Sequence, residues 1–160
     1  MKIDWQPARR SNYGSKRTLL DVDLIILHTV EGSYSSCINT FQSELGDNPR
    51  SSHYVISQKG EVTKMVNEDY VAWHCSGHNY HSIGIEQEGF SNKTDWCTDE
   101  LLLGTATVIA GICKRLGVPP SRAHIKGHSE MIWHSGNSDV GPYYRWDDLL
   151  LLVMKKLDEV

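Results

Sequence analysis

One short apolar run constrains the fold of this chain more than any other feature. Residues 23–27 read Asp-Leu-Ile-Ile-Leu, and His28 follows them directly. A continuous apolar run of this length is typical of a central strand that is buried on both faces. The run therefore predicts a sheet that is covered on both sides, and it places His28 at the end of a central strand.

The rest of the chain indicates an α/β domain with a mixed central sheet flanked by helices. Helical spacing of apolar residues predicts helices over residues 35–45, 98–117 and from about 147 onward. Alternating or short apolar runs predict strands over residues 52–57, 62–66, 82–88 and 123–126, of which the first two form a hairpin. Thr98 is expected to open the long helix and Gly117 to end it.

Two segments are expected to be irregular, the N-terminal one up to about Asp21 and the glycine- and serine-containing one at residues 72–81. A length of 160 residues is enough for one domain with a substantial core, so we expect a single domain over residues 1–160. The four cysteines form no Cys-x-x-Cys pair, and we expect them to be free thiols.

Charge and hydropathy exclude some classes of protein. The formal net charge is −4, whereas a general nucleic-acid binder has a basic surface, so we expect no nucleic-acid partner. The N-terminal residues lack the apolar stretch of a secretory signal. The longest apolar run, residues 149–154, is too short to cross a bilayer. We therefore expect synthesis in the cytoplasm without a signal peptide.

Three residues far apart in the sequence are candidate metal ligands. His28 ends the central strand, His128 follows the strand predicted at 123–126, and Asp139 lies 11 residues beyond His128. Two imidazoles and a carboxylate form the ligand set of a catalytic zinc with one open position. Spacing alone leaves the alternative that these are ordinary hydrogen-bonded residues.

A carboxylate on the strand at 82–88 is the candidate general base. Side chains alternate along a strand, so Ile83 and Ile85 share one face while Gly84, Glu86 and Glu88 share the other. Gly84 is expected to leave open space beside Glu86, which could then face a cleft. The alternative from the pattern is a solvated sheet face.

The segment at 72–81 holds four potential metal ligands within eight residues, namely His74, Cys75, His78 and His81. His74 and His78 would share one face of a helix, but the glycine, serine and asparagine between them disfavour a helix. The pattern favours a polar cleft wall over a metal site.

With these segments in view, the sequence resembles the type 2 N-acetylmuramoyl-L-alanine amidase family, which includes phage endolysins, recycling amidases and peptidoglycan recognition proteins. The matching segments appear in family order and read LIILHTVEGS, SSHYVISQKGEV, AWHCSGHN, SIGIEQEG, HIKGHSE and SDVGPYYRW. The resemblance implies the amidase and peptidoglycan recognition protein-like fold. It also implies a Zn²⁺ ion held by His28, His128 and Asp139.

The resemblance assigns further roles. It implies that Glu86 is the catalytic carboxylate, at the position that recycling-type amidases use, and that His74 lines the substrate groove. Two departures concern groups that act on the substrate. Asn137 stands where many members have a lysine that would polarise the substrate carbonyl, and Ser52 stands where some have a catalytic tyrosine, which leaves Tyr54 as a candidate replacement. We expect Asn137 and Tyr54 to contact the substrate.

A third departure concerns the metal. The loop from His128 to Asp139 contains His134, which is a rival for the position of third ligand, although Asp139 is preferred.

The function implied by the resemblance is zinc-dependent hydrolysis of the amide between the lactyl group and L-alanine of peptidoglycan, by a monomer. We expect an endolysin that acts on the cell wall after release by a separate factor. The alternatives are a non-catalytic peptidoglycan-binding module and an intracellular amidase that recycles muropeptides.

Overall fold

The computed structural model describes residues 1–159 and is built around a six-stranded mixed sheet, whose strand order is β1-β5-β4-β7-β3-β8. The strands are β1 (Ile3–Trp5), β3 (Leu24–Thr29), β4 (Tyr54–Ile56), β5 (Val62–Lys64), β7 (Ser82–Gln87) and β8 (Ile125–Gly127). The hairpin pair β4–β5 is antiparallel and the other neighbours are parallel. The expected mixed sheet is confirmed.

The predicted central strand is β3, which pairs with β7 on one side and with β8 on the other. Ile25, Ile26 and Leu27 are completely buried, because both faces of the sheet are covered. Their side chains alternate, so Ile25 and Leu27 belong to one core cluster and Ile26 to another.

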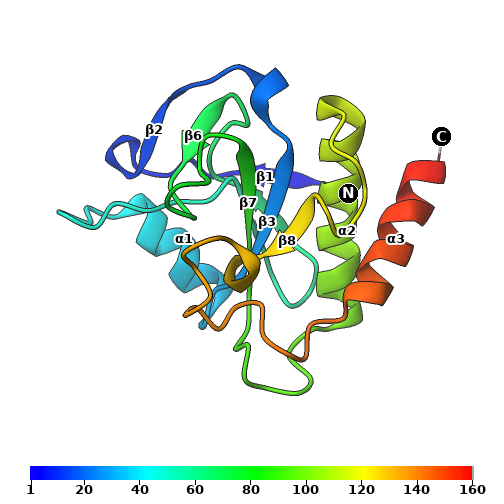
Figure 1. Ribbon diagram of the computed structural model, residues 1–160. Coiled ribbons are helices and arrows are strands. Elements are labelled where there is room, and N and C mark those ends of the chain that lie inside the picture. Colours follow the sequence, from blue (N-terminus) through cyan, green and yellow to red (C-terminus); the bar gives the residue numbers. More distant parts are fainter. Residues whose placement is uncertain (160) are drawn as a thin grey trace.

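Two helices cover one face of the sheet and one helix covers the other, as Figure 1 shows. The helices are α1 (Tyr34–Gln42), α2 (Asp99–Leu116) and α3 (Trp146–Asp158). α2 and α3 pack against each other and bury the larger core, whereas α1 packs near β4 over a smaller one. Within residues 1–159, no helix has the length and apolar character needed to cross a membrane.

Local signals fix α2 where the sequence predicted it. The Thr98 side chain accepts a hydrogen bond from the backbone N–H of Leu101, which caps the first turn. Gly117 ends the helix in the left-handed region with φ 73°, a conformation that glycine adopts without strain. α1, in contrast, ends at Gln42 rather than at residue 45. Buried Asn12 donates to the carbonyls of Phe41 and Ser43, which gives those helix-end carbonyls partners.

The expectation of an irregular N-terminal segment is wrong in part. β1 adds to the edge of the sheet beside β5, and β2 (Tyr13–Lys16) pairs with β6 (Tyr70–Ala72) in a small antiparallel sheet. All three residues of β1 are exposed, so no apolar alternation marked the strand. Pairing with a distant neighbour defines these strands, and local sequence carries little of that information.

Arg17, just after β2, ties this region to the start of β7. Its guanidinium is 7 % exposed and donates to the backbone carbonyls of Glu68, Asn79, Tyr80 and Ser82 at 2.8–3.0 Å. The five N–H groups of a guanidinium can satisfy several carbonyls at once. Arg17 therefore fixes the loop that precedes β7, from which part of the candidate site is built.

Candidate active site

The carboxyl ends of three neighbouring parallel strands bring the candidate residues together. His28 on β3 is the register partner of Glu86 on β7, and Leu27 is the partner of Gly127 on β8. His128 follows Gly127 directly and therefore lies beside His28. Ligand sites in parallel sheets commonly form at this edge, where the carboxyl ends of several strands meet.

His28, His128 and Asp139 form a compact cluster. The two Nδ1 atoms lie 3.2 Å apart, and the Asp139 carboxylate lies 3.3 Å from His28 Nδ1 and 3.2 Å from His128 Nδ1. Two ring nitrogens and a carboxylate thus face one point, an arrangement that can hold a metal ion. The structure therefore brings together the three residues that the sequence predicted as metal ligands.

Asp139 reaches the cluster because the chain folds back after His128. The carbonyl of Asp139 accepts a hydrogen bond from the backbone N–H of Ser129, and the next side chain, Val140, is buried in the larger core. Burial opposes ionisation of Asp139, but hydrogen bonds to His128 and His28 outweigh it and hold its pKa well below the ordinary value. The carboxylate is therefore ionised at neutral pH.

The ring of His28 is oriented by a chain of hydrogen bonds behind it. His28 Nε2 lies 2.9 Å from His74 Nδ1, His74 Nε2 lies 3.1 Å from Ser82 Oγ, and Ser82 Oγ donates to the carbonyl of His78. Because Ser82 Oγ uses its proton on that carbonyl, it accepts from His74 Nε2. His74 Nδ1 then accepts from His28 Nε2–H, which leaves the Nδ1 lone pair of His28 for a metal.

His74 stays neutral in this arrangement. Burial lowers its pKa well below the ordinary value, and the positive charges that His28, His53 and Arg17 can carry lower it further. The sequence predicted that the segment at 72–81 forms a cleft wall, and His74 indeed lines the site while also contacting His28.

The expectation of open space at Gly84 is wrong. The His74 ring lies over Gly84, at a distance where a Cβ on residue 84 would collide with it. Glycine is needed at this position because the close approach of the imidazole leaves no room for a side chain.

Glu86 lies beside the cluster and faces the cavity, as strand alternation predicted. Burial raises the pKa of its carboxyl, although a positive charge on neighbouring His28 would lower it. Among the described residues, no hydrogen-bond partner exists for buried Glu86 Oε2. A desolvated carboxylate oxygen without a partner can accept a proton from a molecule bound in the cavity.

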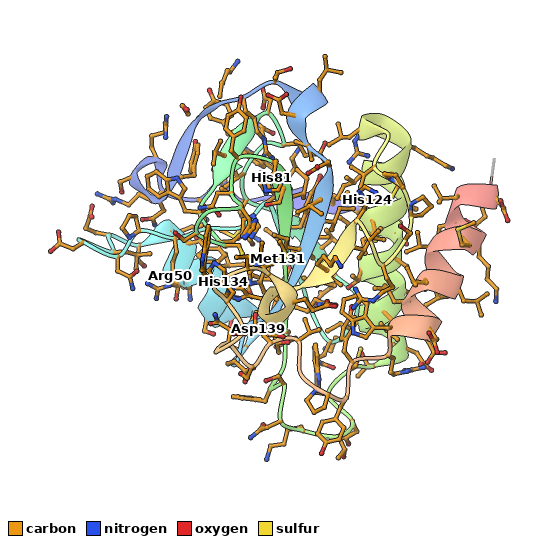
Figure 2. The ribbon with its side chains drawn as sticks, in the orientation of Figure 1. Arg50, His81, His124, Met131, His134 and Asp139 are labelled. Atoms are coloured by element: carbon orange, nitrogen blue, oxygen red, sulfur yellow. The ribbon has the colours of Figure 1, made fainter. Side chains whose placement is uncertain are left out.

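Three adjoining cavities form a groove over the cluster. The central one, about 220 Å³, is lined by His28, His128, Asp139 and Glu86 among others. Its neighbours share lining residues with it and have volumes of about 190 Å³ and 400 Å³. Arg50 lines all three, and Figure 2 shows it on the same side of the molecule as Asp139.

Arg50 was missed in the sequence, since one arginine in an irregular segment gives no local signal. Trp73 lines two of the three cavities, which was also unforeseen beyond its place in the matched segment AWHCSGHN.

Two candidate substrate contacts have different positions. Tyr54 is not brought to the groove, because it lies in the core under α2, and its hydroxyl donates to Glu68 at 2.7 Å. Ser52, its neighbour on the same strand face, is also buried. Asn137 is exposed in the loop before Asp139, and its side chain donates to the carbonyl of His134. Tyr54 therefore lies outside the groove, whereas Asn137 lines none of the three cavities and its contact with the substrate stays a prediction.

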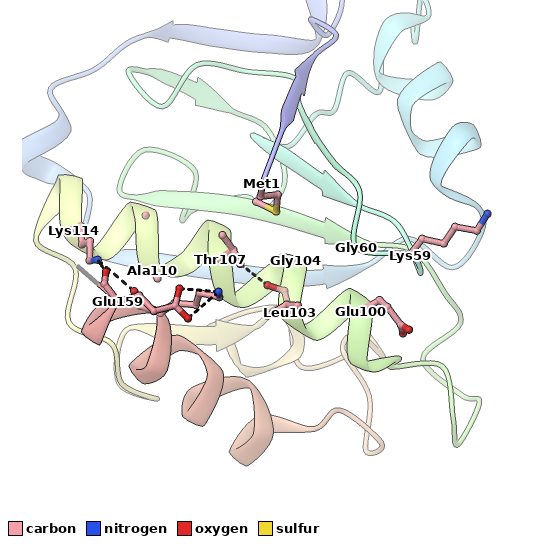
Figure 3. Close-up of a pocket in the computed structure, with 12 residues that line it drawn as sticks. Met1, Lys59, Gly60, Glu100, Leu103, Gly104, Thr107, Ala110, Lys114 and Glu159 are labelled. Atoms are coloured by element: carbon pink, nitrogen blue, oxygen red, sulfur yellow. Dashed lines mark hydrogen bonds and ion pairs between the residues drawn. The ribbon is translucent and has the colours of Figure 1, made fainter.

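A separate cavity of about 550 Å³ lies along α2 and the end of α3, away from the cluster (Figure 3). Its polar rim includes Lys114, which donates to the carbonyl of Glu159, and Lys156, which pairs with the Glu159 carboxylate. Its wall includes the small residues Gly104 and Ala110 of α2. None of the residues expected to act in catalysis lines it.

Comparison with known proteins gives concordant matches. The family described as N-acetylmuramoyl-L-alanine amidase matches residues 18–142. N-acetylmuramoyl-L-alanine amidase A of Achromobacter lyticus is 31% identical over 166 residues, covering 93% of this chain and 92% of that protein.

Solved structures share the fold at lower identity. A crystal structure of an AmpD derivative has a TM-score of 0.79 and 22% identity, and the match covers 94% of each chain. A mutant endolysin from Bacillus subtilis has a TM-score of 0.71 and 17% identity, and the match covers 96% of this chain and 99% of that one.

Proposed function

The chain belongs to the N-acetylmuramoyl-L-alanine amidase family, and on that premise we propose that it is a zinc-dependent enzyme that hydrolyses the lactyl–L-alanine amide of peptidoglycan. One observation carries the proposal. Three potential ligands converge to within 3.3 Å of one another beside Glu86, whose Oε2 has no partner among residues 1–159.

The donor set fits zinc. Ligand atoms about 2.0–2.2 Å from a tetrahedral zinc lie about 3.3–3.6 Å from one another, and the separations here, 3.2–3.3 Å, are close to the short end of that range. Imidazole and carboxylate are ordinary zinc ligands, and three protein ligands are what catalytic sites use. When bound, zinc would act as a Lewis acid toward the scissile carbonyl and lower the pKa of water at the open position.

Glu86 would supply the proton transfers. Its free oxygen accepts a proton from the water that attacks the lactyl carbonyl, and it returns this proton to the L-alanine nitrogen as the C–N bond breaks. The products are a lactyl carboxylic acid and a stem peptide with a free amino terminus. A raised pKa suits this role, because the same carboxyl must act first as base and then as acid.

The groove supplies binding groups for an acidic peptide attached to a sugar. The Arg50 guanidinium lines all three cavities and can pair with a carboxylate of the stem peptide. Trp73 offers an apolar ring in the same groove. Outside these cavities, in the loop before Asp139, we assign Asn137 a hydrogen bond to the substrate, in place of the charge that lysine gives many family members.

The decisive experiment combines product and metal analysis. Purified peptidoglycan is digested, and the products are identified by mass spectrometry while zinc is measured in the same protein sample. We expect free stem peptides beginning with L-alanine and one zinc per chain. Glu86→Gln should retain zinc and lose activity by about 10²–10⁴-fold. Hydrolysis at another bond, or full activity of Glu86→Gln, would contradict the proposal.

The proposal also covers the biological role of the enzyme, which could be that of an endolysin or of a recycling amidase. We propose an endolysin that reaches the wall after release by a separate factor, and that works as a monomer because one chain provides the whole cluster. The second candidate is an intracellular recycling amidase. It is favoured by Glu86, which stands where recycling-type amidases carry their catalytic carboxylate.

Parallel assays on intact cell walls and on soluble muropeptides separate these roles. An endolysin should clear a suspension of walls, whereas a recycling enzyme should act mainly on the soluble substrate. A non-catalytic binding module would bind walls and release no peptide.

A further inference from the structure

We infer that His134 is a positioning residue, which holds the ring of the metal ligand His128 by accepting a hydrogen bond from it. This role rests on the proposed function, because it assumes that His128 binds zinc. The family resemblance gives His134 no such role, and from the sequence this residue was a rival for the position of third ligand.

Two short contacts connect His128 to the backbone through His134. His128 Nε2 lies 3.0 Å from His134 Nδ1, and His134 Nε2 lies 2.8 Å from the carbonyl oxygen of Ser76. A carbonyl can only accept, so the proton of a neutral His134 ring is on Nε2. Nδ1 of His134 is then an acceptor, and His128 donates its Nε2–H to it.

This assignment fixes the tautomer of His128. When the proton of His128 is on Nε2, its Nδ1 carries the lone pair. That is the form in which an imidazole binds a metal ion. This Nδ1 lies 3.2 Å from Asp139 Oδ1 and 3.2 Å from His28 Nδ1. A hydrogen bond from the distal N–H also orients the ring and raises its basicity as a ligand.

The fold places His134 through two turns in the loop that leads to Asp139. The backbone N–H of His134 donates to the carbonyl of Met131, and the N–H of Asn137 donates to the carbonyl of His134. Met131 is buried with Ile26 and Cys75, which anchors the loop on the sheet. Figure 2 shows His134 beside the end of β8, near Asp139 and Met131.

The two histidine ligands are thus supported in the same way from different segments. His28 donates to His74, and the hydrogen bonds continue from His74 through Ser82 to the carbonyl of His78. His128 donates to His134, which in turn donates to the carbonyl of Ser76. Both chains end on the loop before β7. That loop therefore sets the orientation of both rings.

A competing role for His134 is ligation of a second metal ion. Donor atoms of Cys75, His128 and His134 lie within 4.8 Å of one another. Cys75, however, is 1 % exposed among apolar side chains, and burial raises the pKa of its thiol to about 12. The contact of His134 with Ser76 and the apolar setting of the thiol favour the hydrogen-bonding role.

The test is zinc affinity, measured for the full chain by competition with a chromophoric chelator. In a histidine-to-asparagine change the amide oxygen lies near the former Nδ1, so His134→Asn keeps an acceptor for His128. His134→Gln extends its amide toward the former Nε2 and leaves His128 without a close acceptor, and His134→Leu removes both contacts. His124→Leu is the matched control, since Figure 2 shows His124 away from the cluster.

We expect His134→Leu and His134→Gln to weaken zinc binding by about 10–100-fold. His134→Asn, His124→Leu and Cys75→Ala should bind zinc as the wild type does. After zinc has been removed with a chelator, the melting temperature should be similar for all His134 variants, because the side chain is partly exposed in a loop.

Unchanged zinc affinity in His134→Leu would overturn the role, as would equal weakening in Asn and Leu variants. Two zinc ions in the wild type, with one lost in both Cys75→Ala and His134→Leu, would replace it with a second metal site. A wild-type chain that binds no zinc would instead contradict the proposed function, and the role of His134 with it.

Discussion

The imidazole of His74 occupies the space above Gly84, where a Cβ on residue 84 would lie 2.5 Å from the His74 Cγ. This contact joins the middle of β7 to the cluster of His28, His128 and Asp139, because Nδ1 of the same imidazole, 2.7 Å from that Cβ position, accepts the hydrogen bond from His28. Gly84, which has no side chain, thereby leaves room for the ring that orients His28, a candidate metal ligand distant from Gly84 in the sequence.

Gly84→Ala should therefore impair the metal site. The added methyl group must push the His74 ring away, at a typical cost of about 1–3 kcal/mol for overpacking, and His28 loses its oriented acceptor. We expect zinc affinity to fall at least about 10-fold, measured by chelator competition. Gly32→Ala is the control, since its Cβ would meet its neighbours at 3.4 Å or more. Equal zinc affinity in both variants would contradict the link.

The identity of the third ligand can be decided by two substitutions. Asp139→Asn removes the charge that faces both imidazoles, so this variant should lose its zinc on dialysis, as shown by metal analysis. His134→Asn should keep zinc, because His134 contacts the side of His128 that faces away from Asp139. Asp95→Asn, at an exposed site, serves as control. Zinc retained by Asp139→Asn and lost by His134→Asn would reverse the assignment.

Tyr54→Phe tests a residue that the sequence placed in the substrate groove and the structure places in the core. The hydroxyl donates to Glu68, which also binds Arg115. Its removal should lower the free energy of unfolding by about 1–2 kcal/mol, measured by urea denaturation. Hydrolysis of muropeptides at a temperature where both proteins are folded should be unchanged. A loss of turnover without a loss of stability would return Tyr54 to the groove.

His53 gives the stability of the protein a specific pH dependence. Its Nδ1 accepts from the backbone N–H of Gly84 and its Nε2 lies 2.9 Å from the carbonyl of Tyr70, so the neutral ring is satisfied. Burial, together with the nearby charge of Arg17, lowers its pKa to about 3. In the unfolded chain a histidine has a pKa of about 6.5. Between these values only the unfolded state binds the proton.

The contribution of His53 to the free energy of unfolding should therefore be complete above about pH 6.5 and decrease as the pH falls toward 3. The decrease from this one group is about 1.4 kcal/mol per pH unit. His53→Asn keeps an acceptor for Gly84 N–H and does not titrate. Urea unfolding of both proteins between about pH 6 and pH 4 should give a steeper dependence in the wild type. Parallel dependences would show that His53 is protonated in the folded state.

Much of the fold was available from local sequence. The apolar run before His28 specified the central strand, and Thr98 and Gly117 specified the ends of α2, because caps and short buried strands depend on neighbours in the chain. Alternation along residues 82–88 also placed Glu86 on the face opposite Ile83 and Ile85. The edge strand β1 was missed, because its residues are exposed and its partner is distant in sequence.

The sequence by itself determined which residue types could bind a metal and which strand ends would carry them. The tertiary structure decided that His28 and His128, 100 positions apart, meet at 3.2 Å. It also decided that His74 fills the space over Gly84, that Tyr54 faces the core, and that Arg50 lines the groove. Local preferences depend on adjacent residues, whereas these relationships depend on strand register and on how loops close between distant elements.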